Sequence, residues 1–171
     1  MNSSERRNNI IRMLKNSSNP ISGVYIANKL NVSRQIIVGD VALLRASGAD
    51  IIATPKGYIL NTKSSNDNYL IKTIACKHSK DFIQEELNIL VDEGITVINV
   101  IVEHSLYGQL TGDMHISSRR DVSDFMSKIH LDDVIPLSTL TDGIHLHTLK
   151  YKDEKSFVEA ISSLKSKGYL L

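Results

Sequence analysis

Hydrophobic positions in the first third of the chain recur at helical spacing and then give way to two short extended runs. A first helix is predicted over residues 4–16, a second after Ser22 and a third after Ser33, because a serine side chain satisfies the unpaired amides at a helix start. Apolar runs at 51–54 and 58–60 flank a Pro-Lys-Gly turn, which predicts a β-hairpin. Three helices followed by a hairpin are the order of a winged helix-turn-helix.

The third predicted helix has two contrasting faces. Ile37, Val41 and Leu44 form a buried stripe, whereas the opposite face carries small or neutral side chains and no acid. Such a face suits a helix that lies in the DNA major groove, which is ~12 Å wide. Gly39 within this face costs about 1 kcal/mol relative to alanine, which is explained equally well by close approach of DNA and by a mildly unfavourable surface residue. A lysine at the hairpin tip can contact a neighbouring phosphate.

The rest of the chain alternates between strand and helix patterns. Strands are predicted at 69–77, 96–102, 109–116 and 144–149, and helices at 81–93, 118–129 and 153–167. The order β-α-β-β-α-β-α predicts a mainly antiparallel sheet with helices on one face, an open sandwich of the α+β class. On the first of these helices, Phe82, Leu87 and Leu90 are expected to face the sheet.

Between the two patterns lies a short polar segment without aliphatic residues. It predicts a linker at 63–68 that joins a domain at 1–62 to a second domain at 69–171. No apolar run approaches the ~20 residues needed to cross a bilayer, and no secretory signal is visible, so no membrane partner is expected. The single cysteine, Cys76, excludes an intramolecular disulfide and fits a reducing compartment, so a cytoplasmic protein is expected.

The net charge of +1 hides an uneven distribution. Residues 1–62 carry eight lysines and arginines against three acidic residues, whereas residues 63–171 carry twelve against sixteen. All six histidines lie in the second part. A basic first domain and an acidic second domain with histidines indicate two separate tasks.

Several histidines lie at positions that suit metal binding. His78 and His104 each close a predicted strand, and His145 and His147 lie two residues apart on another, so that both point to one face. Glu86, expected about two helical turns into the helix after His78, can add a carboxylate. Imidazole and carboxylate suit Zn, Ni, Fe or Mn, and one cysteine excludes a thiolate-rich cluster. A His-x-His pair also occurs on solvated strand faces, so the spacing permits a metal site without requiring one.

The N-terminal residues resemble the winged helices of the biotin-repressor-like group. The shared positions are Ser33-Arg34-Gln35, Ile37, Asp40, Leu44-Arg45, Gly48, Ala53 and Gly57-Tyr58. The resemblance implies DNA contacts from the start and outer face of the third helix. With the hairpin lysine, the predicted DNA-binding set is Ser33, Arg34, Gln35, Val38, Gly39 and Lys56. Many members of that group carry further basic residues on this helix, so the DNA affinity of this chain is expected to depend on dimerisation.

Five motifs in the second domain resemble the three-histidine ligand-sensing domain. They are Ala75-x-x-His78, Glu85-Glu86-Leu87, Glu103-His104-x-x-Tyr107-Gly108, Ser117-Ser118-Arg119 and Gly143-x-His145-x-His147. As a whole, the chain resembles the niacin-responsive transcriptional repressors, which shut down genes of nicotinamide-cofactor synthesis and niacin uptake. The resemblance implies a homodimer on double-stranded operator DNA, with nicotinic acid as corepressor. It also implies a metal held by His78, Glu86, His145 and His147.

Nicotinic acid offers a carboxylate and a pyridine nitrogen, so we expect it to dock at an open metal position near His104, with Arg119 as a partner for its carboxylate. Two alternatives stay open: a regulator of the same build that senses the metal itself, and a metal-dependent hydrolase fused to a DNA-binding module. The sequence contains no nucleophile elbow, no phosphate-binding glycine loop and no H-E-x-x-H motif, so a non-enzymatic protein is expected.

Overall fold

The computed structural model describes residues 2–61, 68–131 and 134–171. The chain divides into two compact units, Met1–Asn66 and Asp67–Leu171, each with its own hydrophobic core. Most of the predicted linker at 63–68 lies outside the described residues. Within the described part of the chain, no helix has the length and apolar character needed to cross a membrane.

The first unit consists of three helices and a two-stranded antiparallel hairpin, in the predicted order. Its elements are α1 (Ser3–Lys15), α2 (Gly23–Leu30), α3 (Arg34–Ala46), β1 (Ile51–Thr54) and β2 (Gly57–Leu60). Ser22 and Ser33 cap α2 and α3 as predicted. The start of α1 differs from the prediction, because Asn2 caps it in a capping box with Glu5.

A buried carboxylate, Asp40, ties α3 to α1. Its side chain is 4 % exposed, and Arg6 donates to it from Nε at 2.5 Å and from Nη2 at 3.2 Å. Arg7 adds an ion pair at 3.5 Å. Arg6 and Arg7, two of the basic residues that make the first unit positively charged, therefore stabilise the packing of α1 on α3.

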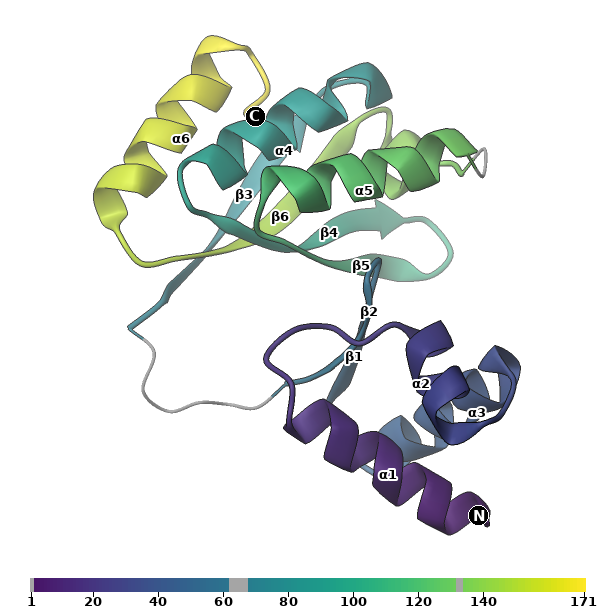
Figure 1. Ribbon diagram of the computed structural model, residues 1–171. Coiled ribbons are helices and arrows are strands. Elements are labelled where there is room, and N and C mark those ends of the chain that lie inside the picture. Colours follow the sequence, from purple (N-terminus) through teal and green to yellow (C-terminus); the bar gives the residue numbers. More distant parts are fainter. Residues whose placement is uncertain (1, 62–67, 132–133) are drawn as a thin grey trace. The chain divides into compact units, whose positions relative to one another are not determined.

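The second unit is an antiparallel sheet with three helices on one face (Figure 1). The strands are β3 (Leu70–Lys77), β4 (Thr96–His104), β5 (Gly108–Ile116) and β6 (Ile144–Tyr151), and the helices are α4 (Ile83–Asp92), α5 (Arg119–Leu131) and α6 (Glu154–Ser166). The strand order in the sheet is β3-β6-β4-β5, so the last strand of the chain lies between the first two of this unit. The predicted α+β class is confirmed.

Two short 3₁₀ helices depart from the predicted elements. The first, η1 (Lys80–Phe82), precedes α4, which begins only at Ile83. Phe82 is therefore 45 % exposed, contrary to the prediction, and Ile83 is buried in its place. For the same reason Glu86 lies in the first turn of α4 and not two turns into the helix. Nothing in the sequence pattern indicates the second, η2 (Leu137–Thr141).

Replacing Asp40 by asparagine should lower the free energy of unfolding of the first unit by about 3 kcal/mol, because Arg6 and Arg7 lose a buried counter-charge. Asp50→Asn is the matched control, since Asp50 is exposed and its carboxylate accepts a hydrogen bond from Asn61. Urea denaturation measures both variants. Equal losses in the two variants would contradict the role assigned to Asp40.

Candidate functional site

The central strand brings two histidines onto the face of the sheet that the helices cover. Burial along β6 alternates, and His145 and His147 point to the same side as the core residues Leu149 and Tyr151. Each imidazole residue is only 3 % exposed. The predicted placement of the pair on one face is confirmed, and that face is buried and not solvated.

His78 reaches the same point from the neighbouring strand. It directly follows β3, which pairs with β6 along its length. Gly143, just before β6, has φ +89°, and a Cβ there would lie 2.1 Å from the carbonyl oxygen of His78. Glycine is therefore required at this position, and it allows the two strand ends that carry the histidines to meet.

Glu86 occupies the centre of the three imidazoles. It comes from the first turn of α4 and is 1 % exposed. Its carboxylate oxygens lie 2.7 Å from Nε2 of His78, 3.1 Å from Nε2 of His145 and 3.4 Å from Nε2 of His147. The structure thus brings together all four residues that the sequence singles out as metal ligands.

A backbone carbonyl orients each ring from behind. The Nδ1–H groups of His78, His145 and His147 donate to the carbonyl oxygens of Ser79, Gly143 and Asn99 at 2.9, 2.8 and 2.7 Å, respectively. Because a carbonyl oxygen only accepts, the proton of each neutral ring lies on Nδ1, and Nε2 faces the centre. Outer hydrogen bonds of this kind orient metal-binding histidines.

The charges of the cluster depend on one another. Burial opposes ionisation of Glu86, but the charge of His147 and hydrogen bonds from the three histidines hold the pKa of Glu86 well below its ordinary value. Burial likewise lowers the pKa of His78 and of His147, yet the hydrogen bonds and charge of Glu86 outweigh it and raise both pKa values.

This donor set fits a divalent transition metal. A carboxylate only accepts hydrogen bonds, so an Nε2 atom that hydrogen-bonds to Glu86 must carry a proton in addition to the proton on Nδ1. A cation can replace these protons, because it accepts electron pairs from the imidazole nitrogens and from the carboxylate. Three nitrogens and a carboxylate oxygen suit Zn, Ni, Fe or Mn.

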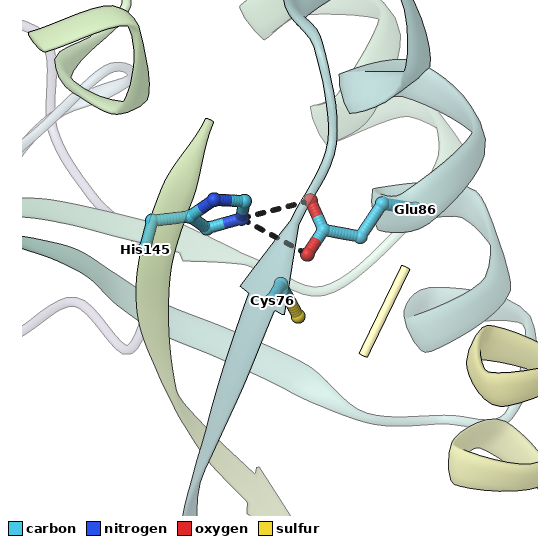
Figure 2. Close-up of side chains that lie close together, drawn as sticks. All are labelled: Cys76, Glu86 and His145. Carbon is cyan, nitrogen blue, oxygen red and sulfur yellow. Dashed lines mark hydrogen bonds and ion pairs between the residues drawn. The ribbon is translucent and has the colours of Figure 1, made fainter. Parts of the chain in front are cut away.

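Sequence reasoning missed one side chain at the cluster. Cys76 is fully buried and lies directly opposite His145 in the β3–β6 pairing. Figure 2 shows it beside the Glu86–His145 pair, and one ligand atom from each of the three residues lies within 4.8 Å of the others. Burial and the negative charge of Glu86 raise the pKa of the Cys76 thiol. Alternation along β3 predicts its buried face, but only the strand register shows which residue it opposes.

His104 shares the sheet face of the cluster but does not join it. It ends β4, in which Val100 lies opposite His147. The half-buried imidazole accepts hydrogen bonds at Nδ1 from the backbone N–H groups of Leu106 and Tyr107, at 3.1 and 3.3 Å. In the described chain, His104 is thus held by its own turn.

Arg119 pairs with the end of α4 that is farther from the cluster of Glu86 and its three histidines. Its Nε and Nη2 donate to the two carboxylate oxygens of Asp92 at 2.7 and 2.5 Å, and its side chain is 65 % exposed. Asp92 is the last residue of α4, at the opposite end of this helix from Glu86. The predicted ligand-binding arginine therefore joins α5 to α4 at the surface.

The predicted DNA-binding residues gather on the outer side of α3 and at the hairpin. Arg34, Gln35 and Gly39 are exposed, Val38 is half-buried, Lys56 is exposed in the turn between β1 and β2, and Ser33 caps α3. Among the residues that the structure describes, none outside α3 has a heavy atom within 4 Å of where a Cβ of Gly39 would be. Two apolar residues not in the predicted set, Ile36 and Leu43, are 41 % and 57 % exposed on the same helix.

Known proteins match both units. A model described as HTH domain matches residues 6–59, and one described as 3H domain matches residues 71–171. The chain is 41 % identical over 167 residues to "Transcription repressor NadR" of Bacillus subtilis, which covers 97 % of this chain and 93 % of that protein. It is also 41 % identical over 167 residues to "Probable transcription repressor NiaR" of Thermotoga maritima, with coverage of 98 % and 94 %. A DNA-binding helix-turn-helix domain followed by a 3H domain, together with these relatives, shows that the chain belongs to the NadR/NiaR family of transcription repressors.

Proposed function

We propose that this repressor controls genes of NAD biosynthesis and niacin uptake. We further propose that nicotinic acid, bound at a metal site in the second unit, raises the affinity of the protein for operator DNA. The observation that supports this proposal is the convergence of three buried imidazole nitrogens on the Glu86 carboxylate. Buried, mutually perturbed titratable groups are costly, and they are found preferentially at functional sites.

In this proposal His78, Glu86, His145 and His147 hold a divalent metal. When bound, the cation supplies a Lewis-acidic position that the carboxylate or ring nitrogen of nicotinic acid can occupy. The carbonyls that hold each Nδ1 orient the imidazoles toward that position before any ligand arrives. His104 lies on the same face of the sheet and is the proposed polar neighbour of the ligand. Arg119 is left out of the site, because it pairs with Asp92 at the end of α4 opposite Glu86.

DNA binding in the proposal requires a homodimer. Two copies of α3 then read two half-sites about one helical turn apart, ~34 Å, on a palindromic operator. Ligand binding favours the dimer geometry with this spacing. The coupling needed between the two sites is modest, since ~1–3 kcal/mol changes DNA affinity by a factor of ~5–150.

The corepressor role is tested by fluorescence anisotropy on a duplex that the zinc-loaded wild-type protein has selected from random sequences in the presence of nicotinic acid. Nicotinic acid should tighten binding ~5–150-fold with zinc present. The effect should vanish with EDTA and in His147→Gln, and it should persist in His130→Gln, which changes an exposed histidine outside the cluster.

Two results of the anisotropy experiment would contradict the proposal. If nicotinic acid left the DNA affinity unchanged, it would not be the corepressor. If EDTA alone abolished DNA binding and nicotinic acid had no effect, the regulator would sense the metal itself.

Gly39→Glu tests whether the outer face of α3 meets DNA. Glutamate is a better helix former than glycine and has space at this exposed position, so the fold should persist. A negative charge facing phosphates should weaken binding to the selected duplex by at least about tenfold, or ~1.4 kcal/mol. Ser123→Glu adds the same charge at an exposed position of α5 and is the control. Equal affinity of the two variants would show that this face does not contact DNA.

Arg119→Ala should leave the response to nicotinic acid unchanged. Its ion pair with Asp92 is exposed, so the free energy of unfolding, measured by thermal denaturation, should fall by less than about 1 kcal/mol. A dose–response titration of DNA affinity with nicotinic acid measures the ligand side. A rise of more than tenfold in the half-effective concentration would return Arg119 to the ligand site.

A further inference from the structure

The single thiol of the chain lies where the hydrophobic core meets the histidine–carboxylate cluster. Cys76 is fully buried, and its core-facing neighbour on β3, Ile74, is aliphatic. A buried cysteine can serve simply as a small apolar side chain. At this position, however, the sulfur adjoins a carboxylate and an imidazole that are themselves nearly inaccessible to water.

We propose that Cys76 is a further ligand of the metal, so that sulfur joins the three imidazole nitrogens and the Glu86 carboxylate. This inference rests on the proposed metal site. Cys76 would be a fifth protein ligand. It lies within β3, whereas His78 directly follows that strand.

The distances support a shared ion. One ligand atom each from Cys76, Glu86 and His145 lies within 4.8 Å of the other two. Typical bonds to zinc are about 2.3 Å for sulfur and about 2.0–2.1 Å for nitrogen, so the ligand atoms of one ion lie roughly 3.5–4.4 Å apart. Side-chain movements of about 1 Å or less bring the three atoms into this range.

The backbone already holds Cys76 in place for this role. Cys76 is the direct partner of His145 across the β3–β6 ladder. On its other side it forms a bridge with Leu170, and the backbone N–H of Leu171 donates to the carbonyl oxygen of Ala75 at 3.0 Å. The strand is thus fixed on both sides, and the sulfur needs only a side-chain adjustment.

Metal binding by the thiol releases one proton. The S–H bond breaks, the proton leaves to solvent, and the electron pair that stays on sulfur is donated to the metal. A thiolate favours zinc, cobalt or nickel over manganese, which prefers oxygen ligands. Cys76 would therefore set metal preference, whereas the histidines and Glu86 provide binding to any of these ions.

X-ray absorption at the zinc edge of the wild-type protein, loaded with one equivalent of zinc, tests the ligand directly. A sulfur scatterer at about 2.3 Å is expected. Competition titrations with a chelating dye then compare Cys76→Ser with Ile74→Val, a conservative change at the adjacent core-facing position. Cys76→Ser should bind zinc at least about tenfold more weakly and manganese with little change, and Ile74→Val should match the wild type in both.

The outcomes separate this inference from the proposed function. Bound zinc with only nitrogen and oxygen neighbours would overturn the role of Cys76 and leave the metal site standing. Failure of the wild-type protein to bind zinc, nickel, iron or manganese would overturn both. The absorption measurement needs no variant, so it decides the question even if Cys76→Ser does not fold.

Discussion

The contact between the Glu86 carboxylate and three imidazoles is the interaction on which the second unit is organised. It joins α4 to both strands of the β3–β6 pair at a point that water does not reach. Farther along α4, Leu87 and Leu90 are fully buried and supply ordinary apolar packing. The helix therefore docks through hydrocarbon along most of its length and through charge at its first turn. Removing one member of such a buried network leaves the others without a counter-charge, which costs far more than an exposed pair would.

Local chemistry made much of the fold predictable. Ser22 and Ser33 cap their helices, Asn31 adopts the left-handed conformation that ends α2, and alternation along β6 places two histidines on one face. The details that differ also have local causes. Asn2, and not a serine, caps the start of α1. The 3₁₀ turn after β3 delays the start of α4, so that Ile83 and not Phe82 is buried.

The candidate site was predictable only in part, because proximity across a sheet depends on strand order and register. The family resemblance named four ligands, and the structure brings them together. Cys76 escaped notice because no spacing rule indicates that β3 pairs with β6, in which its partner His145 lies 69 residues later in the chain. The carbonyls behind the imidazoles carry no sequence signal at all. Arg119 was assigned to the ligand on charge alone, and its surface partner Asp92 belongs to a different helix.

The position of β6 has a mechanical consequence. An edge strand can shift alone, but β6 is hydrogen-bonded to β3 on one side and to β4 on the other. The two histidines it carries are therefore attached to a strand that is paired on both sides, as β4 is, and close-packed interiors transmit strain. A shift of the β6 backbone must be shared by the strands paired with it, β3 and β4. In the proposed function, a ligand that displaced β6 would therefore move its two neighbouring strands with it.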